Sequence, residues 1–326
     1  GAPSNPAPAI KKALKILVPI AGLAAVTAVL LNKVDWTVLA EALKKADGRL
    51  LLGAFAVAAV QPLLTALRLN IYLKASQLAK PYGRCLSAIL AAMSLNAVLP
   101  ARGGDLVKVT FLEDDLRKLP PMVGVTILER VFDILILCLL ALGGAMLSNN
   151  PTATRFALLA TCAPVGALLT LNFADKVPVV GGKLATLAQA CRTAMGRPRL
   201  LIGAWTVSIV CWTSNLLVMS LLLKAVGTSV GFGTVAATMP LAILVGILPL
   251  SISGMGTRDG ALVLLLKGVA APGIVLAGTL LYTAAVYWML ALIGLAFLGR
   301  ETIRKTLGRT RHNQGILKKQ DPTATT

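Results

Sequence analysis

Long apolar runs separated by short basic loops constrain the fold of this chain more than any other feature. Hydrophobic residues make up 56% of its 326 residues and charged residues only 14%, with a mean hydropathy of +0.80. A chain of this composition cannot form an ordinary soluble globule. We therefore predict an all-α, polytopic integral membrane protein with about six full transmembrane helices. The runs lie at 16–31, 50–73, 121–148, 155–172, 200–223 and 273–299.

Two further apolar segments are interrupted by proline and glycine. The first ends at Leu99-Pro100 and the second at Leu248-Pro249, and glycines follow each pair. Proline removes a backbone donor and glycine tolerates a sharp change of direction, so both segments are predicted to be broken helices. A single copy would be explained by a kink or a loop, but paired interruptions in two halves of a membrane protein point to a transport site. We predict two re-entrant hairpins, at 85–112 and 234–270.

The positions of lysine and arginine predict how the chain lies in the membrane. The chain has 32 basic and 13 acidic residues, a net charge of +19. With a cytoplasmic segment at 1–15, one transmembrane domain at 16–299 and a basic cytoplasmic tail at 300–326, the cytoplasmic segments hold 20 basic residues and the opposite side 6. This asymmetry satisfies the positive-inside rule. The same topology makes the two hairpins enter from opposite sides, so the repeat is predicted to be inverted.

Charged residues inside or beside the apolar segments are the candidate site. Charges at membrane depth are costly unless they face protein or water, and Glu129 and Asp133, four residues apart, share one helix face. We predict that four basic residues converge on one anionic group: Arg102, Lys108, Arg130 and Arg258. Four carboxylates are predicted to hold them: Asp105, Glu129, Asp133 and Asp259. Structural pairing is the alternative, and both can hold. Arg68 either snorkels or faces the cavity.

Several other classes of function lack support in the sequence. The five cysteines are scattered without a C-x-x-C pair, and the lone histidine is His312, so neither disulfides nor a metal site is predicted. No nucleotide-binding loop or nucleophile–base set is present, which predicts no cofactor and no enzymatic activity. No basic helix stands apart from the membrane, so no nucleic-acid partner is expected.

Three motifs in order give the sequence a family resemblance. They are Asn96-x-x-Leu99-Pro100-x-Arg102-x-Gly104-Asp105-x-x-Lys108, then Glu129-Arg130-x-x-Asp133, then Leu248-Pro249 with Gly254-x-Gly256-x-Arg258-Asp259. The chain from about residue 10 to 300 resembles the flippase-like integral membrane family that includes the transmembrane region of lysylphosphatidylglycerol synthase, the multiple peptide resistance factor. Asp105 and Asp259 stand where that family often has glutamate, and Lys108 where it often has arginine. The resemblance implies that the charged motif residues, together with Asn96, bind substrate.

Two functions follow from the resemblance and the charged motifs. The first is a flippase that translocates an anionic, aminoacylated or polyprenyl-phosphate-linked lipid between leaflets. The second is a non-enzymatic membrane scaffold or subunit for a lipid- or glycan-modifying enzyme. The sequence ends without the soluble aminoacyl-transferase domain of bifunctional members, which argues against lipid synthesis. The expected partners are a membrane phospholipid or polyprenyl-phosphate lipid and a possible homo-oligomer, in a bacterial or archaeal cytoplasmic membrane.

Overall fold

The structure is a bundle of helices. The computed structural model describes residues 36–96, 104–113, 119–173, 182–247 and 255–297. No β-strand occurs within these ranges, so the all-α prediction is confirmed. The first predicted span and the basic tail lie outside the described residues. The helices are α2 (Trp36–Lys44), α3 (Gly48–Ala75), α4 (Tyr82–Asn96), α5 (Gly104–Leu112), α6 (Leu119–Leu147), α7 (Pro151–Phe173), α8 (Gly182–Met195), α9 (Pro198–Ala225), α10 (Phe232–Ile247), α11 (Thr257–Leu265) and α12 (Pro272–Thr283), followed by a π-helical turn, η3 (Ala284–Trp288).

Local sequence signals fix where three of the long helices begin. The Asp47 carboxylate caps α3 by accepting hydrogen bonds from the backbone N–H groups of Arg49 and Leu50, at 2.8 and 3.4 Å. These bonds satisfy donors that have no partner within the helix. The helices α9 and α12 instead begin at Pro198 and Pro272, where the missing N–H costs no helical hydrogen bond.

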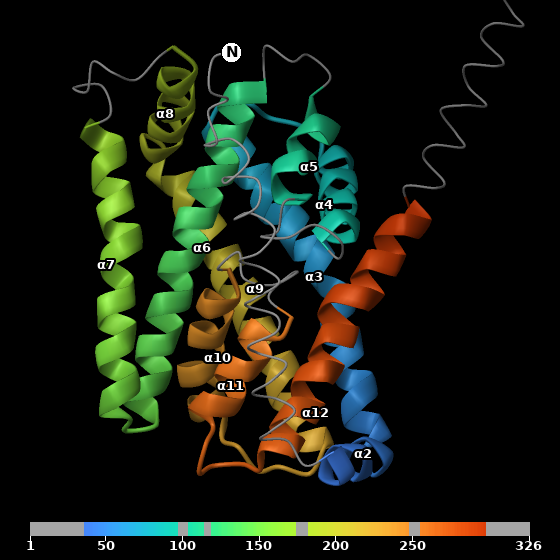
Figure 1. Cartoon of the computed structure of the whole chain (residues 1–326). Coiled ribbons are helices and arrows are strands. Elements are labelled where there is room, and N and C mark those ends of the chain that lie inside the picture. The colour runs from blue at the N-terminus through green and yellow to red at the C-terminus, as the bar shows by residue number, and fades with distance from the viewer. Residues whose placement is uncertain (1–35, 97–103, 114–118, 174–181, 248–254, 298–326) are drawn as a thin grey trace, which may run out of the picture.

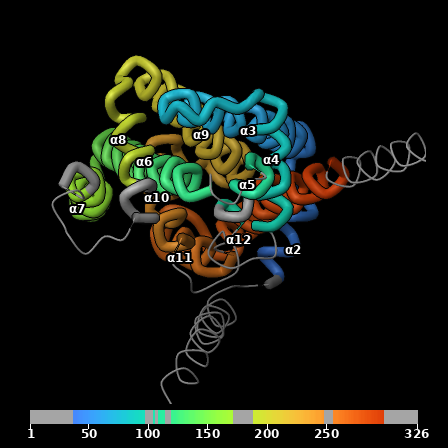
Figure 2. Tube along the Cα trace, turned by 90° about the horizontal axis from the view of Figure 1, so that it is seen from above, coloured from blue at the N-terminus to red at the C-terminus, as the bar shows by residue number. Residues whose placement is uncertain are grey.

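The order of elements from α2 to α6 recurs as α8 to η3, with α7 between the two halves. In Figure 1, α2 lies at the lower end and α8 at the upper end, and the pair α4–α5 lies at the opposite end from α10–α11. The long helices α3 and α9 pack against each other, and Figure 2 shows α7 at the periphery of the bundle. In Figure 1 the two halves run in opposite directions, and that the repeat is inverted across the membrane stays a prediction.

Two glycines mark where each half packs on the other. A Cβ at Gly144 of α6 would collide with the backbone of Ala236 and Ala237 in α10. A Cβ at Gly294, in the helix that continues from η3, would collide with the backbone carbonyl of Leu90 in α4. The last long helix of each half thus lies in close contact with the short helix of the other half. These two close contacts join the halves of the molecule.

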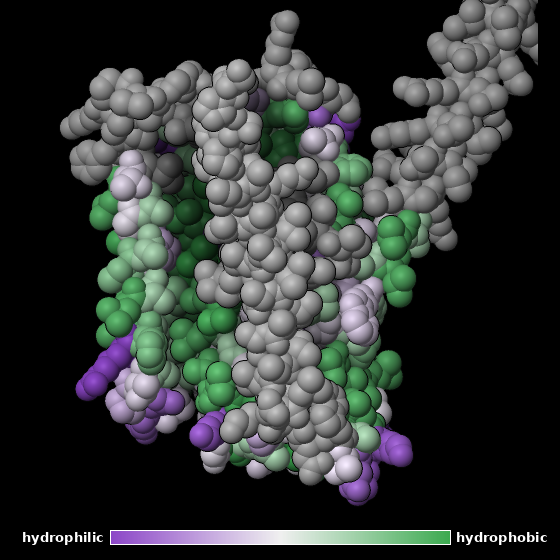
Figure 3. Space-filling view, viewed as in Figure 1, coloured by the Kyte–Doolittle hydropathy of each residue, from purple (hydrophilic) through white to green (hydrophobic). Residues whose placement is uncertain are grey.

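The outer surface of the bundle is apolar. Within the described ranges, four helices are long and apolar enough to cross a membrane: Gly48–Ala75, Pro151–Thr170, Pro198–Ala225 and Pro272–Phe297. The helix α6 also has 29 residues but carries charged residues in its interior. Leu52 and Leu159 are 73% and 70% exposed, and Figure 3 shows apolar side chains over the visible flanks with hydrophilic ones toward the lower end. Apolar surface of this extent suits contact with lipid, and the protein is a multi-pass membrane protein.

The helices α4 and α10 lie within the predicted hairpins. The described part of α4 has 15 residues and that of α10 has 16, about 23 Å each against a hydrocarbon core of about 30 Å. The helices α5 and α11 follow them within the predicted hairpins, and the Leu-Pro pairs between the arms lie outside the described residues. That the hairpins are re-entrant, and that six helices span fully, stay predictions.

Candidate functional site

A cluster of paired ions, most of them buried, lies in the first half. Its members come from α3, α5 and α6, and we call them the ion cluster: Arg68, Asp105, Lys108, Glu129, Arg130 and Asp133. The Arg68 guanidinium donates to Glu129 and Asp133 at 2.6 Å each, and the Lys108 ammonium donates to the second oxygen of Glu129. Burying a charge is favourable only when it is paired and hydrogen-bonded, and each of these groups meets that condition.

Helix geometry brings the two carboxylates of α6 to one arginine. Residues four apart lie on the same face of a helix, so Glu129 and Asp133 both face α3. The indole N–H of Trp212, from α9, donates to Asp133 at 3.0 Å and adds a neutral donor to that carboxylate. The cluster is therefore held from both halves of the molecule.

Arg130 is one of four members of the ion cluster that line a cavity, with Arg68, Asp105 and Asp133. Its guanidinium donates to Asp105 at 2.9 Å and to Asp133 at 3.4 Å, while its side chain remains 30% exposed. The amide nitrogen of Asn96 donates to Asp105 at 3.2 Å, which fixes that carboxylate from α4. The Nε atom of Arg130 has no hydrogen-bond partner among the described residues. Arg130 therefore keeps one buried donor that its carboxylate partners do not use.

A second buried arginine lies in the other half. The Arg258 guanidinium donates to Asp259 at 2.6 and 2.9 Å and to the Thr283 hydroxyl at 2.6 Å. It also lies over the rings of Tyr282 and Tyr287, 4.8 and 5.2 Å from their centroids, in cation–π contact. This arginine is fully buried behind the two tyrosines.

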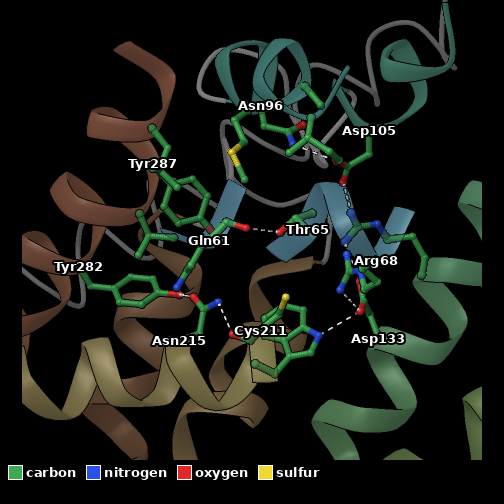
Figure 4. A pocket seen from close by; sticks show the side chains of 17 residues that line it. Gln61, Thr65, Arg68, Asn96, Asp105, Asp133, Cys211, Asn215, Tyr282 and Tyr287 are labelled. Atoms are coloured by element: carbon green, nitrogen blue, oxygen red, sulfur yellow. Dashed lines mark hydrogen bonds and ion pairs between the residues drawn. The ribbon is translucent and has the colours of Figure 1, made fainter. Parts of the chain in front are cut away.

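A polar cavity lies between the two halves. Its volume is about 120 Å³, and Figure 4 shows side chains from several helices around it. One end holds four of the ion-cluster residues, the other end holds amides and tyrosines, and aliphatic side chains complete the wall. The lining residues are Gln61, Thr65, Arg68, Ile89, Ala92, Met93, Asn96, Asp105, Arg130, Asp133, Cys211, Trp212, Asn215, Tyr282, Val286, Tyr287 and Leu290.

The π-helical turn explains why two tyrosines line this cavity. In a regular α-helix, positions i and i+4 share a face, and position i+5 points elsewhere. The i→i+5 bonding of η3 widens the turn, so Tyr287 comes to the same side as Tyr282. Their ring centroids lie 6.4 Å apart. Short π-helical insertions of this kind are frequent at functional sites.

An apolar groove adjoins the charged end of the cavity. It has a volume of about 280 Å³, and it shares Asp105, Arg130, Asp133 and Trp212 with the cavity. Its remaining walls are mainly aliphatic side chains of α6, of which Ile127 is also exposed on the outer surface. The complete lining is Asp105, Thr126, Ile127, Arg130, Val131, Asp133, Ile134, Leu137, Trp212 and Ile247. Polar and apolar spaces therefore meet at Arg130.

The structure separates the predicted site residues into three groups. In the first group are the predicted residues that line the cavity: Asn96, Asp105, Arg130 and Asp133. Lys108 and Glu129 lie behind them, paired with each other and fully buried. Arg258 and Asp259 form their own pair in the second half, where Arg258 contacts the tyrosines of the cavity wall. Arg102 lies outside the described residues. The predicted pairing of basic and acidic side chains is present, and their role in substrate binding stays a prediction.

Several lining residues were not singled out by the sequence motifs. They are Gln61, Trp212, Asn215, Tyr282 and Tyr287. Each is a polar or amphipathic residue inside an apolar helix, a signal that is present in the sequence but shared with many residues that only pack. Arg68, for which the sequence left two orientations open, faces the cavity and pairs with α6.

These features define a class of protein: a multi-pass helical membrane protein with two inverted halves and a buried ion cluster beside a polar cavity. The family described as the lysylphosphatidylglycerol synthase TM region matches residues 14–294. The chain belongs to that family, as its motifs predict, and the family relates it to lipid modification or transport. No match is found among curated proteins.

Proposed function

We propose that this protein is a flippase that moves a phosphate-bearing lipid between the leaflets of a bacterial or archaeal cytoplasmic membrane. The candidate cargoes are an anionic phospholipid, an aminoacylated phospholipid and a polyprenyl-phosphate-linked lipid. The chain acts in this proposal as a transporter without enzymatic activity.

The junction between the polar cavity and the apolar groove carries the proposal. A lipid has a polar head joined to an apolar tail, and the two adjoining spaces offer matching surroundings. Arg130 lines both spaces and keeps an unbonded Nε among the described residues. A phosphate at Arg130 would place the head group in the cavity and let the tail follow the groove along α6 toward the surrounding lipid.

The ion cluster supplies a physical reason for faster translocation. A charged head group crosses hydrocarbon slowly because the apolar interior does not replace its hydration. A guanidinium at the junction can donate to a phosphate and replace part of that hydration. The carboxylates that hold Arg130 keep the empty site near neutrality, so the site is not an isolated buried charge.

The inverted halves supply a reason for movement in two directions. In transporters built from inverted repeats, one half moves against the other around a central site, which opens it to each side in turn. The cavity here lies between the halves and is lined by both. Because the sequence contains no nucleotide-binding motif, we infer movement down a gradient or coupled to an ion gradient.

Translocation in proteoliposomes tests the proposal. A fluorescent lipid analogue placed in the inner leaflet becomes accessible to an external quencher when it is moved. We expect wild type to expose it faster than protein-free vesicles, and Arg130→Gln to slow that rate by roughly tenfold or more, the equivalent of one charge-assisted hydrogen bond. The control is Arg155→Gln, the same substitution at an exposed position of α7, which should match wild type.

Equal rates for wild type, Arg130→Gln and protein-free vesicles, across phosphatidylglycerol, aminoacylated and polyprenyl-phosphate substrates, would contradict the flippase. That result would favour the scaffold instead.

A further inference from the structure

The end of the cavity away from the ion cluster is built from neutral polar groups. The Tyr282 hydroxyl donates to the Asn215 side-chain oxygen at 2.7 Å, and the Asn215 amide nitrogen donates to the Cys211 carbonyl at 3.1 Å. These bonds fix the amide and the phenol in place. Figure 4 shows the Gln61 side chain extending toward this pair.

Gln61, which lines this end of the cavity, carries a buried donor with no hydrogen-bond partner among the described residues. The residue is only 4% exposed, and the unmet donor is its Nε2 atom. Buried polar groups are nearly always paired, so each exception requires an explanation. A ligand group that accepts or shares a hydrogen bond at this position would satisfy the amide.

The charges around the cavity disfavour a cationic head group here. The carboxylates in the lining are Asp105 and Asp133, and both are paired with arginine. The tyrosine rings, the other ordinary partners of an ammonium group, already lie under the Arg258 guanidinium. An amine entering this end would meet a buried cation where it needs a carboxylate or an aromatic face.

We propose that the end formed by Gln61, Asn215 and Tyr282 binds the uncharged, hydroxyl-bearing head of an anionic phosphodiester lipid, with the phosphate at Arg130. This inference rests on the proposed function and narrows its cargo. Hydroxyl groups both donate and accept, which matches a wall of amides and phenols. About 10–15 Å³ suffices for one water, so a cavity of about 120 Å³ has room for a glycerol or one sugar unit.

Equilibrium binding to purified full-length protein in detergent separates these head groups. The first arm compares phosphatidylglycerol with phosphatidylmethanol, which has the same charge and chains but lacks hydroxyls. The second arm compares a polyprenyl-phosphate monosaccharide with the methyl ester of the same polyprenyl phosphate. Phosphatidylethanolamine and lysyl-phosphatidylglycerol serve as amine-bearing probes.

We expect the hydroxyl-bearing lipid to bind about tenfold more tightly in at least one arm, the value of one good hydrogen bond. The responding arm identifies glycerol or sugar as the head. The preference should shrink toward unity in Gln61→Leu and persist in Gln189→Leu, the same substitution at an exposed position of α8. The wild-type ratios alone decide the matter if Gln61→Leu does not fold.

Equal binding within both arms, or tighter binding of the amine-bearing probes, would overturn the inference while leaving the flippase proposal standing. Failure of every lipid to bind would overturn both, and the two failures are therefore distinguishable.

Discussion

Neutralising Glu129 should destabilise the protein more than most single substitutions. Glu129 is fully buried and accepts hydrogen bonds from Arg68 at 2.6 and 3.1 Å and from the ammonium of Lys108. Glu129→Gln would leave Lys108, also fully buried, without its carboxylate, and Arg68 with Asp133 alone. Removing one partner of a buried pair typically costs about 3–5 kcal/mol, because the other charge stays in a medium of low polarity.

That loss is large against a typical stability of about 5–15 kcal/mol, and it shifts the unfolding equilibrium by roughly two to four orders of magnitude. The assay is thermal and denaturant-induced unfolding of purified variants in one detergent. The control is Glu41→Gln, which removes an exposed pair with Lys45 and should cost less than about 1 kcal/mol. Replacing Lys108 by Met in the Glu129→Gln background removes the stranded charge, so the double variant should recover part of the loss. A melting temperature of Glu129→Gln within the range of the Glu41→Gln control would refute the reasoning.

The remaining predictions concern the junction, the packing and the topology. Arg130→Lys should fold but bind anionic lipid roughly tenfold more weakly, measured by lipid titration, because an ammonium cannot reproduce the planar fork; unchanged affinity would contradict the role of the guanidinium. Gly144→Ala should lower the melting temperature by the equivalent of about 1–3 kcal/mol, because its Cβ meets backbone, whereas Gly166→Ala, with open space around it, should not; similar melting of both would contradict the close packing. On a cysteine-free background, single cysteines at Asn150 and Lys319 should be labelled by an impermeant thiol reagent from opposite sides of the membrane, and same-side labelling would contradict the topology.

The helical architecture followed from local patterns. The apolar runs predicted α3, α6, α7, α9 and the last helix, because a chain segment in lipid must satisfy its backbone hydrogen bonds internally and a helix does so. The Leu-Pro and glycine signals predicted an interruption after α4 and after α10; the Leu-Pro pairs lie outside the described residues, so the interruption stays a prediction. Such features depend on a few neighbouring residues, which a single sequence displays directly.

The site depended on contacts that no local pattern contains. Arg68 pairs with Glu129 across 61 positions of sequence, and its place within an apolar run is equally compatible with snorkelling. Lys108 was predicted from its motif to bind an anionic group, but it is fully buried and paired with Glu129. Tyr287 would point away from Tyr282 in a regular helix, and only the π-helical turn, which the sequence did not indicate, brings both to the cavity.

An experimental structure in lipid nanodiscs containing phosphatidylglycerol or a polyprenyl-phosphate monosaccharide tests the central claim most directly. The account predicts a lipid whose phosphate lies within hydrogen-bonding distance of Arg130, whose head occupies the polar cavity and whose tail follows the groove lined by Ile127 and Ile134. A cavity filled by the protein's own side chains, or bound lipid confined to the outer surface with no phosphate near Arg130, would contradict it.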